Sequence, residues 1–370
     1  MKIYYTQKIF KLLSNRYLRL FLIYASKKLT GRHLMIRMDT NDACNLKCIM
    51  CPFSNPLRKP FGGPMSMENF RIIAEKLFLK TRYLYLSCLC EPLLSPRFPD
   101  YLDLVSQYKI PFVSYATNGL LLNEKTISAT LKNGINEVII SVDAATKDTY
   151  EKIRKGGDWA LLCKKLYEFT EARKFNTGSN TQLRFNYTVM KENIHEIKDF
   201  ISFASAYNPS SIQLRLFYDR TGSIKTNEDE PVNKQYLNML PAIRKECRKY
   251  KILLISELVP AKEIRNRDIA ILRLADLSPD IVLKKTPARN KTNVPQPAFI
   301  NCQLPWFSIY LHLNGDMYPC AVYSESIGNI FSQSFEEIEN SPVLTKLRKN
   351  LFNEPDIDCI ECQQNSASGV

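Results

Sequence analysis

The sequence predicts an α/β protein made of an open parallel barrel and a small C-terminal domain. Two observations predict it. From residue 34 onward, short apolar segments alternate with amphipathic helical ones, which is typical of parallel strands joined by helical crossovers. Near the C-terminus, Asn314-Gly315 stands between two β-rich runs and a helix-prone stretch follows. This order predicts a β-hairpin and a helix beyond the barrel.

The barrel is expected to contain six β/α units. Its strands are predicted near Leu34–Asp39, Tyr83–Leu89, Phe112–Thr117, Glu137–Asp143, Gln182–Val189 and Ser211–Phe217. Its helices are predicted near Met67–Leu79, Pro99–Tyr108, Glu124–Lys132, Lys147–Phe175 and Ile194–Ala206. A closed barrel of eight units typically takes about 250 residues, whereas these six fill about 180. An open, TIM-like (β/α)6 barrel is therefore the better prediction.

The same pattern divides the chain into five parts. We expect a basic helical segment over residues 1–33, the barrel over 34–220, a connecting segment over 221–300, the small C-terminal domain over 301–364 and a tail over 365–370. The connecting segment holds one further candidate strand near Ile252–Ile255 and ends in a stretch with three prolines, which is typical of an exposed linker.

Basic residues are concentrated at the N-terminus. Residues 1–38 hold nine Lys or Arg and no acid, within a chain of net charge +14. Because these residues are also rich in Leu, Ile, Phe and Tyr, an amphipathic helix is a better interpretation than a nucleic-acid-binding arm, and no nucleic-acid partner is expected. The longest apolar run, Leu20–Ala25, is too short for a membrane span or a signal sequence.

Two interpretations of this helix stay open. It can pack against the barrel with its Lys and Arg side chains in water, which is the commoner arrangement. Alternatively, residues 1–28 can lie on an anionic membrane surface. The 11 cysteines are an odd number and no secretory signal is visible, which favours reduced thiols. The expected compartment is the cytoplasm, with membrane association as the alternative.

Three cysteines form the most informative motif of the chain. Cys44, Cys48 and Cys51 follow the first predicted strand with the spacing Cys-x3-Cys-x2-Cys. Three thiolates make a metal site short of one ligand. A structural zinc ion takes four protein ligands, whereas an iron–sulfur cluster can leave one iron open. A zinc knuckle and three incidental thiols are the alternatives.

This spacing resembles the signature of the radical S-adenosylmethionine (SAM) superfamily. The resemblance implies that each of the three cysteines binds one iron of a 4Fe-4S cluster and that the fourth iron chelates SAM. It also implies that an electron, expected from a flavodoxin or a ferredoxin, splits SAM and leaves a 5′-deoxyadenosyl radical. In such enzymes the cofactor carries the chemistry, and the protein supplies placement and exclusion of water.

Polar residues past the strand ends match further parts of this family's pattern. Because catalytic groups of parallel barrels gather at the carboxyl ends of the strands, their placement agrees with the resemblance. By that resemblance, the expected SAM contacts are Glu91, Asn118, Ser141, Asp143, Arg154 and Val189. Two residues depart from the pattern. Met50 stands where an aromatic side chain is common, and Cys90 replaces a glycine.

A second cysteine set lies near the C-terminus and consists of Cys302, Cys320, Cys359 and Cys362. The predicted helix between Ser334 and Phe352 can fold the last pair back over the hairpin. Four thiolates satisfy either a structural zinc ion or a fully ligated cluster, and ligand count alone does not decide between them. The segment resembles a SPASM domain in its shorter twitch form. That resemblance implies one auxiliary 4Fe-4S cluster held by these four cysteines.

The expected reaction depends on the auxiliary cluster. Its four irons are all bound by cysteines, so it has no open iron for substrate and is expected to transfer electrons. The reaction is the two-electron dehydrogenation of a sugar-like or other small polar substrate, with the auxiliary cluster as electron acceptor. A peptide or protein maturase is the first alternative, and a non-catalytic iron–sulfur or zinc scaffold is the second. Other chemistry-bearing residues are expected to be structural or on the surface, although a redox role for the Cys88 and Cys90 pair stays open: Cys88, Cys90, Asp219, Glu257, His33, His195 and His312.

Overall fold

The computed structural model describes residues 16–54, 63–217, 229–256, 302–351, 355–356 and 358–359. Several predictions from the sequence fall outside these residues. They concern Cys362, Asp219, Glu257, residues 1–15, most of the linker up to residue 300 and the tail over 365–370.

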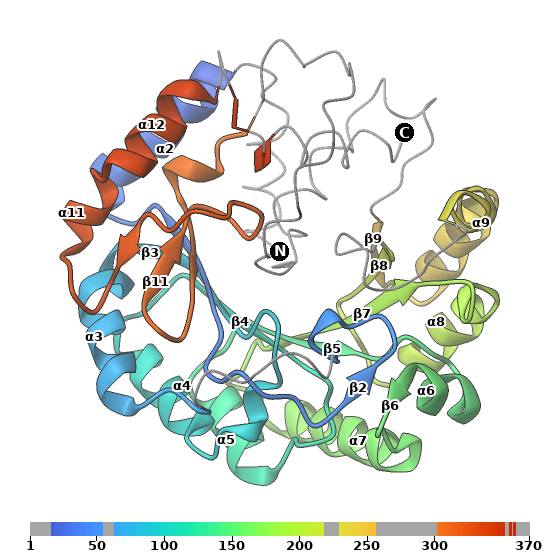
Figure 1. Cartoon of the computed structure of the whole chain (residues 1–370). Helices are drawn as coiled ribbons and strands as arrows, with labels where there is room; N and C mark the ends of the chain where they lie inside the picture. The colour runs from blue at the N-terminus through green and yellow to red at the C-terminus, as the bar shows by residue number, and fades with distance from the viewer. Residues whose placement is uncertain are drawn as a thin grey trace.

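One curved sheet organises the described residues. Its ten strands follow the order β12-β11-β10-β1-β3-β4-β5-β7-β8-β9 (Figure 1). The seven strands from β1 to β9 run parallel, which confirms the predicted α/β class. Their bounds are β1 (Leu34–Met38), β3 (Thr81–Leu86), β4 (Phe112–Thr117), β5 (Glu137–Ser141), β7 (Gln182–Val189), β8 (Ser211–Leu216) and β9 (Leu253–Ser256).

Helices cover the outer face of this sheet (Figure 1). Side chains alternate between the two faces of a strand, and Leu84, Val138 and Phe185 point outward into a core with Phe70 and Phe200. The helices are α3 (Met67–Leu77), α4 (Phe98–Gln107), α5 (Glu124–Lys132), α6 (Lys147–Ile153), α7 (Trp159–Phe175), α8 (Ile197–Ser205) and α9 (Asp229–Lys249). Short 3-10 turns are η1 (Pro52–Ser54), η2 (Phe78–Lys80), η3 (Pro92–Leu94) and η4 (Ile194–Glu196).

The single helix predicted over Lys147–Phe175 is wrong. It is two helices, α6 and α7, separated by the strand β6 (Arg154–Lys155). The break has a local cause, since Gly156 has a φ of +88°, which no helix residue adopts, and Asp158 accepts the Leu161 amide to cap α7. The turn is also close-packed, because a Cβ at Gly157 would lie 2.8 Å from the Arg154 carbonyl oxygen. Because β6 pairs antiparallel with β2 (Lys47–Cys48), the break places Arg154 opposite Cys48.

The strand predicted to reach Leu89 also ends earlier. β3 stops at Leu86, and Ser87 has a φ of +80°. Cys88 and Cys90 therefore lie in a loop and not on a strand, so strand alternation does not put their thiols on one face. This loop leads directly into Glu91.

The C-terminal region joins the same sheet. After η6 (Leu304–Trp306) come β10 (Ser308–Leu311), β11 (Asp316–Tyr318) and β12 (Gly328–Asn329). The predicted hairpin is confirmed, because β10 and β11 pair antiparallel around Asn314-Gly315. β10 also pairs in parallel with β1. The expected single helix is two, α11 (Phe335–Glu339) and α12 (Pro342–Asn350), because Ser341 caps a new helix that begins with Pro342.

The N-terminal helix α2 (Arg16–Thr30) lies beside α11 on the outside (Figure 1). The Lys27 ammonium is 2.6 Å from a Glu339 carboxylate oxygen. Just past the helix, the Arg32 guanidinium donates to the carbonyl oxygens of Phe78, Thr81 and Tyr108 at 2.7–3.0 Å. Among the described residues, no helix has the length and apolarity needed to cross a bilayer.

Candidate active site

The cysteine loop follows β1 at the edge where the carboxyl ends of the parallel strands meet. Cys44 is exposed, Cys48 is buried and Cys51 is half-buried. Burial raises the pKa of Cys48 to about 12, while the adjacent guanidinium of Arg154 acts in the opposite direction. The charges of Cys51 and Cys44 also raise this pKa. All three predicted thiols therefore lie within electrostatic reach of one another.

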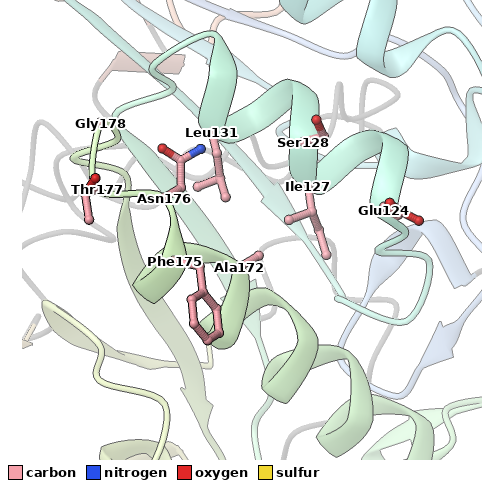
Figure 2. Close-up of a pocket in the computed structure, with 9 residues that line it drawn as sticks. All are labelled: Glu124, Ile127, Ser128, Leu131, Ala172, Phe175, Asn176, Thr177 and Gly178. Carbon is pink, nitrogen blue, oxygen red and sulfur yellow. The ribbon is translucent and has the colours of Figure 1, made fainter.

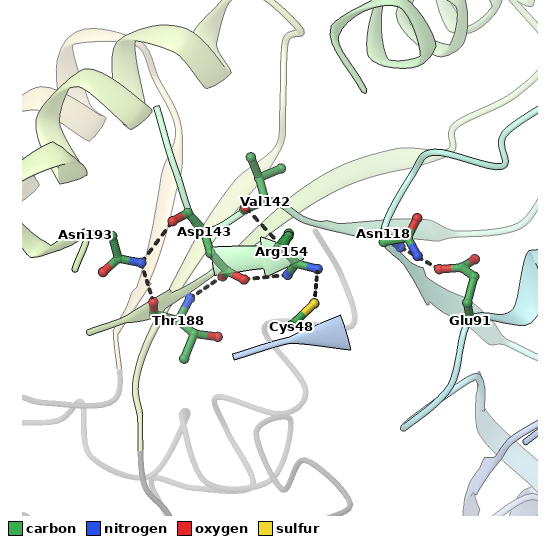
Figure 3. A network of polar contacts seen from close by, with 8 residues as sticks. All are labelled: Cys48, Glu91, Asn118, Val142, Asp143, Arg154, Thr188 and Asn193. Carbon is green, nitrogen blue, oxygen red and sulfur yellow. Dashed lines mark hydrogen bonds and ion pairs between the residues drawn. The ribbon is translucent and has the colours of Figure 1, made fainter. Parts of the chain in front are cut away.

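A buried ion pair stands next to Cys48 (Figure 3). The Arg154 Nη2 atom lies 2.5 Å from the Asp143 Oδ2 atom, with 7% and 1% of the two side chains exposed. Arg154 also donates through Nε to the Val142 carbonyl at 3.1 Å and through Nη1 toward the Cys48 sulfur at 3.9 Å. Burial alone would lower the pKa of Arg154, but Asp143 and Cys48 raise it above its usual value. A fixed positive charge thus faces the sulfur.

Asp143 is held from a second direction. Its backbone has a φ of +64°, and its Oδ1 atom accepts the Thr188 amide at 2.6 Å. Asn193 donates to the carbonyl oxygens of Asp143 and Thr188 at 2.9 and 2.8 Å (Figure 3). These contacts join the ends of β5 and β7 and orient the Asp143 carboxylate toward Arg154.

Glu91 is the second buried acid of this edge. Its carboxylate accepts the Thr117 hydroxyl and the Asn118 amide at 2.7 Å each, and the Leu93 amide at 3.1 Å. Burial raises the pKa of Glu91 to about 7, against the lowering effect of these hydrogen bonds. Asn118 also donates to the Asn45 side chain at 2.8 Å. The acid is thereby linked to the cysteine loop.

Ser141 and Val189 flank this network without joining it. Ser141 ends β5, is half-buried and pairs with Asn186 of β7. Val189 is 1% exposed and its side chain belongs to the hydrophobic core. The structure therefore brings Cys48, Asp143 and Arg154 into direct contact, links Glu91 and Asn118 to the cysteine loop, and leaves Ser141 and Val189 at the margin.

Asp39 is a structuring residue that the motif analysis missed. One of its carboxylate oxygens accepts the amides of Cys88, Leu89 and Cys90 at 2.8, 2.9 and 3.3 Å. These bonds fix the loop that would hold a glycine in the family pattern, so the Cys90 backbone is positioned by an acid some 50 residues away. The sequence feature that could have indicated this role is the position of Asp39 at the end of the first predicted strand.

The inner face of the sheet is polar. The Arg37 guanidinium lies 5.3 Å from the Tyr85 ring centre, and Arg184 contacts Glu137 at 2.9 Å and Gln213 at 3.3 Å. Burial raises the pKa of Tyr85 to about 12, while the charges of Arg37 and Arg184 act in the opposite direction. The strand registers place Arg37, Tyr85, Glu137 and Arg184 on the same face of the sheet, so this face carries charged and aromatic side chains.

The second cysteine set is described for three of its four members. Cys302, Cys320 and Cys359 are half-buried and pack against the core. Asp358 accepts the amide and hydroxyl of Ser324 at 2.8 and 2.7 Å. This bond ties the segment that carries Cys359 to the segment that follows Cys320. Cys362 lies outside the described residues.

The cysteine loop fits an iron–sulfur cluster. No three Cys, His, Asp or Glu side chains in the described ranges form a site for one metal ion. A cluster does not require such convergence, because each thiolate binds a different iron. The guanidinium beside Cys48 offsets the negative charge that such thiolates carry. Cys44, Cys48 and Cys51 would hold the cluster.

A groove of about 470 Å³ between α5 and α7 is separate from this edge (Figure 2). It is lined by apolar and polar side chains of the outer helical layer, including Ile127, Leu131 and Phe175. None of the cysteines or the predicted SAM contacts lines it. We assign no chemistry to it.

Comparison with known families matches both parts of the chain. The radical SAM superfamily model matches residues 38–204. The chain is a radical SAM protein. A SPASM model, described as an iron–sulfur cluster-binding domain, matches residues 302–363. Radical SAM domains bind a 4Fe-4S cluster and SAM, and SPASM domains bind auxiliary iron–sulfur clusters, so the predicted cofactors of this radical SAM protein are confirmed.

Two curated relatives are similar in sequence. The subtilosin biosynthesis protein AlbA of Bacillus subtilis is 24% identical, over 82% of this chain and 59% of AlbA. The mycofactocin maturase MftC of Mycobacterium ulcerans is 24% identical, over 52% of this chain and 50% of MftC. Other relatives are named GTP 3′,8-cyclase and match about half of this chain, with 47% covered in one case. This radical SAM protein thus spans 50–59% of the length of AlbA and MftC.

Solved structures of SuiB from Streptococcus suis share the fold. SuiB bound to its precursor peptide SuiA has a TM-score of 0.63 and 16% identity, covering 91% of this chain and 72% of SuiB. SuiB bound to SAM has a TM-score of 0.60 and 15% identity, covering 88% and 70%. This likeness confirms the predicted barrel and C-terminal region as one known architecture.

Proposed function

We propose that this radical SAM enzyme is a peptide or protein maturase. It would reductively cleave SAM, remove a hydrogen atom from an unactivated C–H bond of a peptide and complete a two-electron oxidation. The second electron would pass to an auxiliary cluster and a proton would leave to solvent. The observation that supports a peptide most is the AlbA match, because it extends over 82% of the chain and is not limited to the barrel.

The residues at the carboxyl edge have distinct roles in this proposal. Cys44, Cys48 and Cys51 hold the cluster, and Arg154 offsets its charge while meeting the SAM carboxylate. When bound, SAM and the two clusters supply the hydrogen-abstracting radical and accept the remaining electron. The contacts of Arg154 with Val142 and Asp143 support its role, because they hold the guanidinium beside Cys48.

Glu91 and Asn118 are proposed to orient the amino group of SAM, on the same methionine moiety as the carboxylate. An ammonium group favours the ionised form of a neighbouring carboxylate, and Glu91 has a pKa raised to about 7 by burial. Binding of the SAM amino group would therefore draw Glu91 into its charged form. Asp143 and Ser141 are proposed to contact the ribose, and Val189 to lie against the adenine through its backbone.

The auxiliary site is proposed as one 4Fe-4S cluster on Cys302, Cys320, Cys359 and Cys362. Iron analysis of the anaerobically reconstituted protein tests this count. Two clusters predict about eight iron atoms per chain, whereas about four irons with one zinc would contradict the auxiliary cluster.

The substrate class is tested by direct comparison. The reduced enzyme is incubated with SAM and either short peptides encoded next to its gene or a panel of amino sugars, and products are analysed by mass spectrometry. We expect a peptide that has lost two hydrogen atoms, with one 5′-deoxyadenosine formed per product. A ketone from an amino sugar, with unchanged peptides, would overturn the maturase proposal and favour the dehydrogenation predicted from the sequence.

A further inference from the structure

The outward face of α2 is unusually apolar for an exposed surface. Leu18, Phe21, Tyr24 and Leu29 are 41%, 62%, 57% and 85% exposed. These four are among the ten exposed large hydrophobic side chains in the described part of the chain. At about 100° per residue, their positions fall within one arc of the helix. We call these four residues the α2 stripe.

The contacts of α2 hold this stripe toward solvent. Lys27 reaches Glu339 of α11 on another side of the helix, and Arg32 fixes the end of α2 to three carbonyl oxygens of the barrel. Lys28 lies on the same side as the stripe, with its ammonium 5.7 Å from the Tyr24 ring centre. A helix anchored in this way cannot roll its stripe inward without breaking these bonds.

The charge around the stripe selects its partner. The sequence of residues 1–38 has nine basic residues and no acid. Of these, Arg37 is buried and Arg32 and Lys27 bind other parts of the chain, whereas Lys28 lies beside the stripe. A second copy of the chain would bring the same positive segment against this one, and like charges oppose such an interface. An anionic lipid bilayer has an apolar interior and negatively charged headgroups. It therefore complements aliphatic and aromatic side chains that lie next to lysine.

We propose that α2 docks this enzyme on the surface of an anionic lipid bilayer. The leucine and phenylalanine side chains of the stripe enter the boundary between headgroups and acyl chains. Tyr24, with an apolar ring and a polar hydroxyl, suits the headgroup level. Lys28, on the same side of α2 as the stripe, contacts the lipid phosphates. The enzyme lies on the membrane and does not span it.

Vesicle sedimentation of the full-length, cluster-loaded chain tests the proposal. Vesicles of phosphatidylcholine alone are compared with vesicles of equal parts phosphatidylcholine and phosphatidylglycerol, at low and at high salt. We expect binding to the mixed vesicles only, weakened by salt. Phe21→Glu should reduce that binding by at least about tenfold, because an aromatic side chain is no longer transferred out of water.

Phe175→Glu is the matched control. Phe175 is 83% exposed on α7, so the two variants make the same change from Phe to Glu at exposed helical positions. The control should bind vesicles like the unchanged chain. The proposal is overturned if mixed vesicles are not bound, or if both variants bind equally. It is also overturned if light scattering shows a dimer that Phe21→Glu dissociates, since a second copy would then cover the stripe.

Discussion

At the scale of single residues, the pair of Arg154 and Asp143 dominates the site. Both side chains are almost fully buried, and the guanidinium also faces the Cys48 sulfur. Removing one member of a buried pair leaves the other charge without its partner in a medium of low polarity. The pair therefore positions the cysteine loop and makes the loop dependent on it.

Arg154→Ala is expected to lower the free energy of unfolding by about 3–5 kcal/mol, because Asp143 stays buried and charged. Anaerobic urea unfolding of the cluster-free protein measures this loss. Lys125→Ala is the control. It removes a surface partner of Asp100 at 3.6 Å and should change stability by less than about 1 kcal/mol. A loss below that size for Arg154→Ala would contradict the role of the pair.

Sequence reasoning found the groups with a local signature and missed those without one. Cys44, Cys48, Cys51 and Arg154 lie in short motifs, and the structure brings them to one edge. Asp39 and Asn193 act on backbone amides and carbonyls of segments far away in the chain. No local pattern distinguishes an acid or amide with such a role from a surface residue, so only the fold reveals it.

At the scale of elements, the turn between β10 and β11 depends on a glycine. Gly315 has a φ of +89°, and a Cβ there would lie 2.4 Å from the Phe331 ring and 2.8 Å from the Asn329 side chain. The sequence predicted this hairpin because Asn-Gly is a strong local signal. It missed the breaks at Gly157 and Ser341, because a helical period continues across them.

Gly315→Ala should destabilise the hairpin by about 2 kcal/mol or more, from backbone strain and steric overlap together. Fluorescence of Trp306 during urea unfolding reports the loss. Gly134→Ala isolates the strain alone, since Gly134 has a φ of +62° with no atom within 4 Å of an added Cβ. Equal effects of the two substitutions would show that the overlap at Gly315 is relieved without cost.

The contact between α2 and α11 is predicted to depend on pH. The His33 imidazole and the Lys27 ammonium lower the pKa of Glu339 to about 2. A carboxyl group with a lowered pKa stabilises the fold above its unfolded value of 4.5, and this contribution is lost as the pH falls toward 2. Between these limits, the unchanged chain should lose more stability than Glu339→Gln. Urea unfolding at several pH values measures this loss. Equal losses of stability in the two chains between pH 4.5 and pH 2 would disprove the prediction.

At the scale of the whole molecule, the barrel and the SPASM region share one sheet. β10 pairs with β1 from Met35 to Met38, so the SPASM hairpin covers an edge that the barrel would otherwise expose. The sequence indicated two units because a proline-bearing linker separates them. It could not predict the pairing, since strands far apart in the chain carry no signal of which edges meet.

A shared sheet predicts cooperative unfolding, which the two tryptophans can report separately. Trp159 packs on Phe203 of the barrel at 4.8 Å between ring centres, and Trp306 lies in η6 of the SPASM region. Trp159→Phe and Trp306→Phe leave one reporter each. We expect both variants to unfold at one urea midpoint. Two separate midpoints would show that the pairing of β10 with β1 does not couple the regions.

Cleavage of SAM tests the central claim most directly. The anaerobically reconstituted chain is reduced with dithionite, mixed with SAM and analysed for 5′-deoxyadenosine, beside Cys48→Ala and the control Cys163→Ala, a thiol of α7 outside both cysteine sets. We predict product from the unchanged chain and from Cys163→Ala, and only background from Cys48→Ala. Product formed equally by Cys48→Ala, or by none of the three, would contradict the assignment of the cysteine loop.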